Sequence, residues 1–194
     1  MNEEYWKTFY ESSPDLKEPS PFAKYVLEKI NKNSLLVDLG CGNGKDTFFF
    51  RRNGIDSRGI DRNPLLKEDF FTSGDVLEEL EQADIYYMRF FAHAIEEEYL
   101  DSLLSKINKI SKPNSKIFIE TRSTKGIINL DVYKTSFTSG IGEDHFRVLY
   151  SKNYFASKIE RLFEIIELEE RNGLSIFNGE DPFLIRIYAK VRSR

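Results

Sequence analysis

The sequence predicts an α/β fold whose sheet is mostly parallel, has helices on both faces and ends in an antiparallel hairpin. Strand-like and helical patterns alternate between residues 35 and 122, as they do where a crossover helix follows each parallel strand. A glycine-rich turn joins the first strand pattern to a helical one. The last two strand patterns, 163–173 and 183–191, leave no room for a helix between them, so these strands must pair antiparallel.

The individual elements follow from the spacing of the apolar residues. The expected strands of the alternating part are 35–39, 56–61, 68–75, 84–91 and 115–122. The expected helices are 22–31, 45–54, 76–82 and 96–110, followed by a helix at 151–162 that has Ser151 as its N-cap. The polar stretch 123–144 predicts no element, and the segment HFRVLY leads from it towards the last helix.

Composition is that of one globular domain. The 194 residues are 40% hydrophobic and 31% charged, which allows a sizeable core but is short for two domains. A net charge of −4 argues against a general nucleic-acid binder. One cysteine and two histidines argue against a disulfide framework and a zinc site. No signal peptide or membrane-spanning run is visible, so we expect a cytoplasmic monomer or homodimer without a metal.

The glycine-rich turn has the form of a nucleotide-binding loop. In LLVDLGCGNGKDTFFF (35–50), a G-x-G-x-G pattern at 40–44 lies between a strand and a helix. Because glycine has no side chain, such a loop can turn tightly and a ligand can approach its backbone closely, next to a helix N-terminus. The dinucleotide fingerprint is the longer G-x-G-x-x-G, and here Lys45 follows at once. Asp38, just before the loop, would repel a pyrophosphate and suits a cationic ligand.

Two further acidic residues stand where a nucleoside needs hydrogen-bond acceptors. Asp61 ends the second expected strand, and an acidic group about 20 residues beyond a glycine loop can accept both hydroxyls of a ribose. Asp75 follows the third expected strand. At the crevice where the strand order reverses, it would face the edge of an adenine.

VDLGCGNG, with Asp61 in GIDRN and Asp75 in SGDV, resembles the class I S-adenosylmethionine-dependent methyltransferases over about residues 20–191. The resemblance implies a three-layer Rossmann-like sandwich with a seven-stranded sheet in the order 3-2-1-4-5-7-6. It implies that Asp38 and the loop face the methionine part of S-adenosylmethionine, with Asp61 at the ribose and Asp75 or Val76 at the adenine. The expected cofactor-binding residues are Asp38, Gly40, Cys41, Gly42, Gly44, Asp61, Arg62, Asp75, Val76, Met88, Arg89 and Tyr10.

The N-terminal segment 1–21 is expected to be a lid or linker attached to a core at 22–194. Small bacterial methyltransferases that this chain resembles fold such an aromatic segment over the cofactor. Here the rings are Tyr5, Trp6 and Tyr10. The alternative is that they only cover an exposed helix face.

The candidate acceptor site lies at the carboxyl ends of the later strands, where ligands bind open α/β sheets. Arg89 lies at such an end, and a buried arginine needs an anion, which is either the substrate or a carboxylate such as Glu120 or Glu143. His93 is expected to begin the next helix as a hydrogen-bonded structural or cofactor-side histidine rather than as a base.

His145 and Arg147 are the first candidates for contact with the acceptor. Similar methyltransferases carry a His-x-Arg before the helix that precedes the final hairpin. Residues two apart in an extended segment share a face, so His145 can remove a hydroxyl proton while Arg147 fixes an anionic group. The alternative is a surface strand whose His and Arg are solvated. The candidate catalytic residues are His145, Arg147, Glu120 and Arg89, with Glu120 the second choice as base.

We therefore expect methyl transfer from S-adenosylmethionine to a small anionic acceptor, because Arg89, Arg122 and Arg147 gather near strand ends. O-methylation is favoured. The arginines suggest a nucleotide-activated sugar or a phosphoryl compound. RFFAHAI resembles small methyltransferases of capsule and surface-polysaccharide pathways, and this resemblance implies O-methylation of a sugar or of a sugar-linked phosphoramidate. MRFF in place of an NPPY-type tetrapeptide argues against DNA bases and glutamine. Two alternatives stay open: a catalytically silent S-adenosylmethionine-binding partner subunit and a nicotinamide-dependent reductase.

Overall fold

A computed structural model of the chain describes residues 18–62, 67–138, 144–176 and 179–192. Within them, one sheet contains β1 (Leu35–Leu39), β2 (Asp56–Asp61), β3 (Phe71–Ser73), β4 (Ile85–Arg89), β5 (Lys116–Arg122), β8 (Phe163–Arg171) and β9 (Leu184–Val191). Their order is β3-β2-β1-β4-β5-β9-β8. The first five strands run parallel, and β9 is antiparallel to β5 and β8. The predicted fold class and strand order are confirmed.

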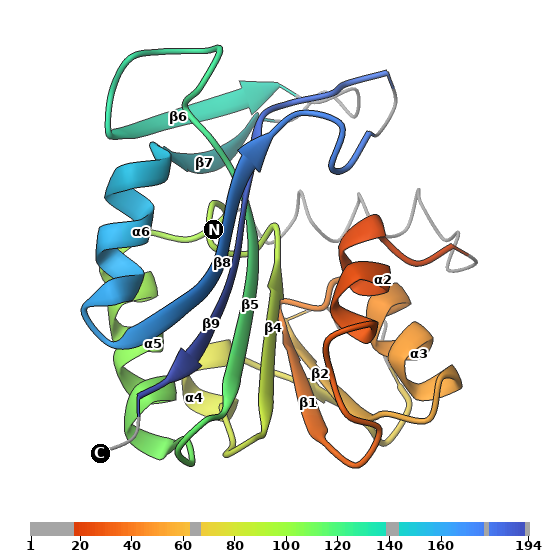
Figure 1. Ribbon diagram of the computed structural model, residues 1–194. Coiled ribbons are helices and arrows are strands. Elements are labelled where there is room, and N and C mark those ends of the chain that lie inside the picture. Colours follow the sequence, from red (N-terminus) through yellow and green to blue (C-terminus); the bar gives the residue numbers. More distant parts are fainter. Residues whose placement is uncertain (1–17, 63–66, 139–143, 177–178, 193–194) are drawn as a thin grey trace.

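Helices cover both faces of the sheet (Figure 1). On one face lie α2 (Pro21–Leu27) and α3 (Lys45–Arg52), and on the other α4 (Val76–Glu79), α5 (Glu97–Ile110) and α6 (Lys152–Glu160). Successive strand residues point to opposite faces of the sheet. Leu36 and Tyr87 therefore fill the core under α2 and α3, and Val37 and Tyr86 fill the core on the opposite face. In the described part, no helix has the length and apolar character needed to cross a membrane.

Several elements are shorter than their apolar patterns predict. The expected helix 22–31 and strand 68–75 are both shortened. The helix after β3 is a single turn, because Leu80 takes an extended backbone conformation and buries its side chain. β4 ends at Arg89 because Phe90 has a φ of 57°, a left-handed conformation that a strand cannot continue through.

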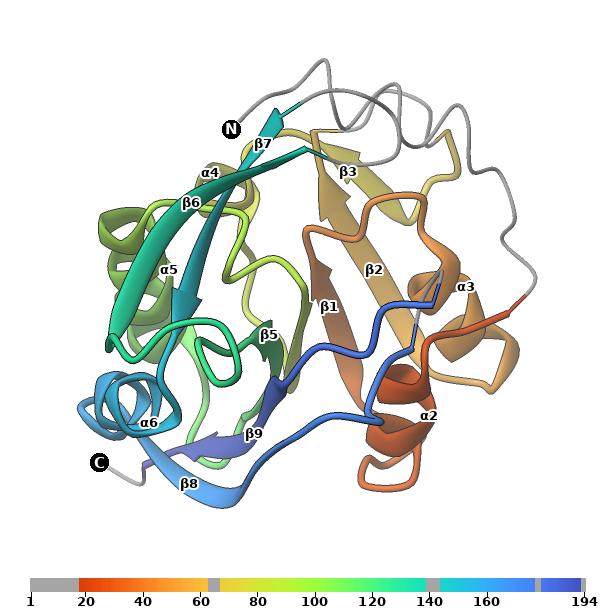
Figure 2. The same cartoon turned by 90° about the horizontal axis from the view of Figure 1, so that it is seen from above.

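The main difference from the prediction is a second, two-stranded sheet. β6 (Val132–Thr138) lies within the stretch 123–144, for which the sequence predicts no element, and it pairs antiparallel with β7 (Asp144–Tyr150). The hairpin stands over the carboxyl ends of the parallel strands (Figures 1 and 2). A bridge between Ser123 and Tyr150 ties it to the end of β5. It therefore stands at the edge where open α/β sheets generally bind their ligands.

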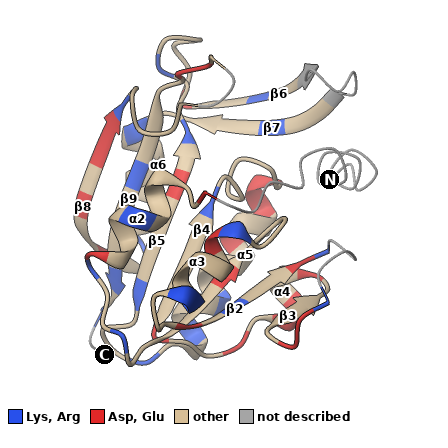
Figure 3. Ribbon diagram, turned by 90° about the vertical axis from the view of Figure 1, so that its right-hand side faces the viewer, with Lys and Arg blue, Asp and Glu red and all other residues tan. Residues whose placement is uncertain are grey.

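The outer edge strand β8 is strongly acidic (Figure 3). Its glutamates are Glu164, Glu167, Glu169 and Glu170. Glu167 accepts a hydrogen bond from the Tyr25 hydroxyl at 2.8 Å and pairs with Lys29 Nζ at 2.6 Å. Charges along an edge strand oppose its pairing with another sheet, so β8 is a protected edge.

Candidate functional site

The glycine loop is fixed against the end of β2. Gly40, Gly42 and Gly44 have φ values of 71°, 61° and 75°, which glycine adopts without steric cost. The amide of Gly40 donates to the carbonyl of Ile60 at 2.9 Å, and the amide of Gly42 donates to Asp61 Oδ2 at 2.8 Å. The loop therefore brings the carboxylate of Asp61 to its own rim.

Asp38 is buried below the loop, with 3% of its surface exposed. Its Oδ2 accepts a hydrogen bond from Thr47 Oγ1 at 2.7 Å. Burial and the neighbouring carboxylate of Asp46 raise the pKa of Asp38 well above its usual value. A cationic ligand nearby would favour the ionised form of Asp38. This agrees with the cationic ligand expected from the position of Asp38 just before the loop.

Asp46 joins the start of α2 to the start of α3. Its Oδ1 accepts from the amide of Ser20 at 2.8 Å, and its Oδ2 accepts from the hydroxyls of Ser20 and Tyr87, each at 2.7 Å. All three residues are buried. No sequence signal marks this role, because an acidic residue in the first turn of a helix is ordinary.

Asp75 caps α4 and is already well supplied with donors. Its Oδ1 accepts from the amide of Leu77 at 2.8 Å and the Tyr99 hydroxyl at 2.7 Å, and its Oδ2 pairs with Arg62. Burial raises the pKa of Asp75, but the hydrogen bonds from Tyr99 and Arg62 outweigh this effect and lower it. An adenine at this position would have to share an occupied carboxylate.

Some other expected cofactor residues have little surface to offer a ligand. The side chains of Met88 and Val76 are buried in the core on the α4–α6 face, so side-chain contacts from them are not supported. Burial raises the pKa of the Cys41 thiol well above its usual value, which suits packing within the loop. Tyr10, with all of residues 1–17, lies outside the described residues, as does Glu143.

Glu120 lies between two arginines at the carboxyl end of β5. Its Oε2 accepts from Arg186 Nε at 2.6 Å, and its Oε1 lies 3.3 Å from Arg89 Nε. Its side chain has no exposed surface, and the β5–β9 register sets it directly opposite Arg186. Burial raises the pKa of Glu120, while both guanidinium groups favour its carboxylate. Glu120 is thus the carboxylate partner of Arg89. A carboxylate paired in this way is better suited to holding the arginines in place than to acting as a base.

His93 joins the end of β5 to β7. It lies in a turn before α5, not in the first turn of that helix as predicted. Its Nδ1 accepts from the amide of Arg122 at 3.2 Å, which leaves its proton on Nε2, and its carbonyl accepts from the amide of Val148 at 2.8 Å. Burial and the charges of Arg147 and Arg122 lower the pKa of His93 well below its usual value. His93 is therefore a neutral, structural histidine.

His145 and Arg147 are alternate residues of β7 and share one face. His145 is 2% exposed, so it is not the solvated histidine of the alternative interpretation. Arg147, Arg122, His145 and Arg89 all lie within electrostatic reach of His93. Among the described residues, no three His, Cys, Asp or Glu side chains are placed to hold a metal ion.

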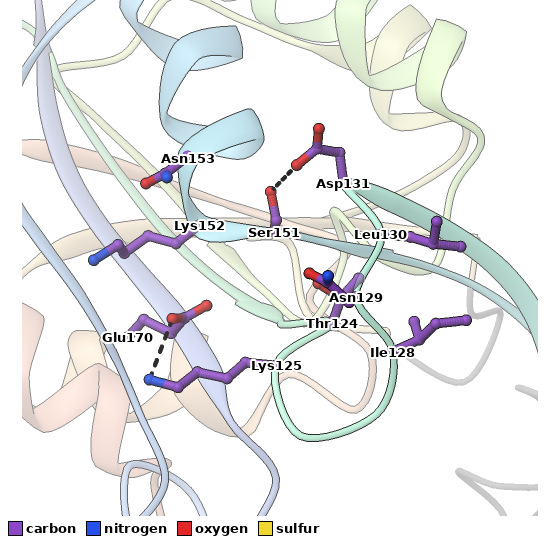
Figure 4. A pocket seen from close by; sticks show the side chains of 10 residues that line it. All are labelled: Thr124, Lys125, Ile128, Asn129, Leu130, Asp131, Ser151, Lys152, Asn153 and Glu170. Atoms are coloured by element: carbon purple, nitrogen blue, oxygen red, sulfur yellow. Dashed lines mark hydrogen bonds and ion pairs between the residues drawn. The ribbon is translucent and has the colours of Figure 1, made fainter.

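A hollow of about 540 Å³ lies between the β5–β6 connection and α6 (Figure 4). It is lined by Thr124, Lys125, Ile128, Asn129, Leu130, Asp131, Ser151, Lys152, Asn153 and Glu170. The Ser151 hydroxyl donates to Asp131 Oδ1 at 2.6 Å, and Lys125 Nζ lies 3.6 Å from Glu170 Oε2. These pairs tie the hairpin connection to α6 and β8. None of the arginines and histidines near His93 lines this hollow.

Comparison with known proteins identifies a family for most of the chain. A family model described as a methyltransferase domain matches residues 15–175. No curated protein matches the chain by sequence. The fold is shared with the 1,6-didemethyltoxoflavin-N1-methyltransferase of Burkholderia thailandensis, at TM-score 0.73 and 12% identity over 98% of this chain and 87% of that one.

Two further solved structures share the fold. One is an S-adenosylmethionine-dependent methyltransferase from Methanosarcina mazei, with a TM-score of 0.72, 12% identity and coverage of 88% of this chain and 98% of that one. The other is the glycopeptide N-methyltransferase MtfA with S-adenosylhomocysteine, with a TM-score of 0.68, 11% identity and coverage of 90% and 91%. At such low identity these likenesses show the fold alone.

Proposed function

This chain belongs to the methyltransferase domain family, and from that premise we propose that it transfers a methyl group from S-adenosylmethionine to an oxygen of a small anionic acceptor. When bound, this cofactor supplies a methyl group on a positively charged sulfur, which is already a strong electrophile. The tasks left to the protein are to align the acceptor and to exclude water.

The glycine loop and the end of β2 fit the cofactor. The loop offers backbone without side chains at Gly40, Gly42 and Gly44, and the half-buried carboxylate of Asp61 stands at its rim. We assign the ribose hydroxyls to Asp61 and the adenine to the Asp75–Val76 turn, with Arg62 held there by Asp75. Asp38, below the loop, faces the cationic methionine part.

The observation that carries the choice of acceptor is the convergence of positive charge around His93. Arg89, Arg122 and Arg147 all act on this buried neutral ring, in a chain whose net charge is −4. Arginine presents a planar fork of donors that matches carboxylate and phosphoryl oxygens. We therefore propose an acceptor that carries such a group, and nucleotide-activated sugars of surface-polysaccharide synthesis are the first class to test.

His145 is the residue that we propose as general base. An alcohol with a high pKa must lose its proton during methyl transfer, whereas an amine needs only its lone pair. His145 lies beside Arg147 on β7, and Glu120 is occupied by Arg186 and Arg89. Two of the compared structures are N-methyltransferases by name, so an amine acceptor is the second candidate.

Replacing His145 with alanine is expected to lower kcat by about 10²–10⁴-fold, the usual contribution of a general base, while the affinity for S-adenosylhomocysteine stays within about twofold. The kcat is measured as the transfer of labelled methyl from S-adenosylmethionine to nucleotide sugars and phosphorylated metabolites. Neutral parent sugars serve as controls. A drop of less than tenfold in kcat would remove His145 as base and favour an amine. Equal turnover of neutral and anionic acceptors would contradict the anion-binding role of the arginines.

A further inference from the structure

The hollow between the β5–β6 connection and α6 has the size of a binding site. Its volume of about 540 Å³ falls in the range of roughly 300–1,000 Å³ that small-molecule pockets occupy. Its described lining includes neither the glycine loop nor Asp61. Two pairs fix its walls, Ser151 with Asp131 and Lys125 with Glu170 (Figure 4). The hollow therefore has fixed walls and lies apart from the proposed cofactor site.

Thr124 places a buried hydroxyl at this hollow. The residue is 3% exposed. Its amide donates to the carbonyl of Tyr150, and its carbonyl accepts from the amides of Ile127 and Ile128, each at 3.0 Å. Among the described residues, no group forms a hydrogen bond with the Thr124 hydroxyl. A buried hydroxyl without a partner costs free energy, and a ligand in the hollow that Thr124 lines would supply the partner.

The first turn of α6 adds further donors to the lining. Lys152 and Asn153 begin this helix after its N-cap, Ser151. Ser151 accepts from the amides of Tyr154 and Phe155. Within the part of the chain that the structure describes, nothing accepts from the amides of Lys152 and Asn153 or from the Lys152 ammonium group. Free amides at a helix N-terminus, together with its dipole, favour an anion.

The two carboxylates of the hollow are already occupied. Asp131 Oδ1 accepts from the Ser151 hydroxyl at 2.6 Å. Glu170 Oε1 accepts from the Ser123 hydroxyl at 2.6 Å, and Glu170 Oε2 lies 3.6 Å from Lys125 Nζ. The groups that stay free are therefore mainly hydrogen-bond donors with one ammonium group. Such a lining fits a ligand that is rich in acceptors and carries a negative charge.

We propose that this hollow binds a saccharide that carries one phosphoryl or carboxylate group. The anion lies at the first turn of α6 beside Lys152, and a ring oxygen or hydroxyl accepts from Thr124. Ile128 and Leu130 line the hollow with 38% and 50% of their surface exposed, which gives the apolar face of a sugar ring a surface to cover. This site goes beyond the proposed methyl transfer and does not depend on it.

Binding is measured by NMR of the full chain, from the methyl signals of Ile128 and Leu130. The added probes are glucose 1-phosphate, glucuronate, glucose and inorganic phosphate. At least one of the two charged sugars is expected to bind with a Kd at least about tenfold lower than that of glucose, the size of a charge-assisted hydrogen bond. Inorganic phosphate is expected to bind more weakly than this sugar, because it has no ring. Saturation with S-adenosylhomocysteine leaves the Kd unchanged.

The variant Lys152→Met is expected to raise the Kd of the charged sugar about tenfold, whereas Lys152→Arg keeps most of the affinity. Thr124→Val replaces the hydroxyl with a methyl group of similar size and is expected to raise the Kd about two- to tenfold. Lys109→Met removes an exposed lysine from α5 and is the matched control. Thermal unfolding checks that each variant is folded, and Lys152→Met alone decides if Thr124→Val is not.

The site is overturned if neither charged sugar binds more tightly than glucose and inorganic phosphate. It is also overturned if Lys152→Met changes the Kd no more than Lys109→Met does. Competition with S-adenosylhomocysteine would place the sugar in the proposed acceptor site and contradict a separate one. Tighter binding of glucose 1-phosphate identifies a phosphoryl ligand, and tighter binding of glucuronate identifies a carboxylate; either supports the site. Each of these outcomes is independent of whether the chain transfers methyl groups.

Discussion

Replacing Glu120 with glutamine is expected to lower the free energy of unfolding by about 3–5 kcal/mol, the cost of leaving a buried charge without its partner. Arg186 is 6% exposed and lies directly opposite Glu120 across β5 and β9. Without the carboxylate, its guanidinium group keeps the Leu174 carbonyl but loses its buried counter-charge. Equilibrium unfolding in urea, followed by two probes, measures the change.

A matched control lies on the neighbouring pair of strands, β8 and β9. Glu164 pairs with Lys190 at 3.3 Å but its side chain is 54% exposed, so Glu164→Gln is expected to cost less than about 1 kcal/mol. The double change Glu120→Leu with Arg186→Met removes this buried pair but leaves Arg89 without its carboxylate, so it is expected to recover only part of the loss. A Glu120→Gln cost as small as that of Glu164→Gln would contradict the buried pairing.

Replacing Gly40 with alanine is expected to lower the free energy of unfolding by about 2–5 kcal/mol and to abolish binding of S-adenosylhomocysteine. The new Cβ would lie 2.2 Å from Cδ2 of Phe91, and the residue has a φ of 71°. Left-handed strain costs about 1–2 kcal/mol, and overpacking of a filled site costs about 1–3 kcal/mol more. Urea unfolding and calorimetry measure the two effects.

The variant Gly54→Ala is the control that separates the backbone strain from the steric contact. Gly54 has a φ of 81°, and nothing lies within 4 Å of the position where its Cβ would be. Gly54→Ala is therefore expected to cost only the backbone strain, about 1–2 kcal/mol, with no change in cofactor binding. If both alanine variants lose the same stability, the contact with Phe91 does not constrain the loop.

Local patterns were sufficient to predict that the glycine loop lies beside Asp61. The glycine loop and Asp61 lie at the ends of adjacent parallel strands, so their meeting follows from the strand order once the alternation of strands and helices is recognised. Ser151 was recognisable as an N-cap for the same kind of reason, because it acts within one turn of the chain.

Contacts between distant strands were not predictable in this way. The pairing of Glu120 with Arg186 depends on the β5–β9 register, although an arginine within the apolar run PFLIRIYAKV was a signal that some partner was needed. Ser175 contacts Arg89 from the β8–β9 connection, which is also bonded to Arg186 through the carbonyl of Leu174.

The β6–β7 hairpin escaped prediction because its first strand has little apolar alternation. VYKTSFT alternates weakly and lies in a polar stretch, so its pairing with β7 decides its conformation more than its own residues do. Met88 shows a contact that the sequence position suggested and that the side-chain direction does not support. Its position at the edge of the sheet suggested a ligand contact, but its direction on β4 places it in the core.

Titration of the full chain with S-adenosylhomocysteine, with NADH in parallel, is the most direct test of the central claim that this site holds the methyl-donor cofactor. We predict a single binding event with S-adenosylhomocysteine, no heat with NADH, and a loss of affinity of at least about tenfold in Asp61→Ala, because Asp61 accepts from the ribose. No heat with S-adenosylhomocysteine, or saturable binding of NADH instead, would contradict the account.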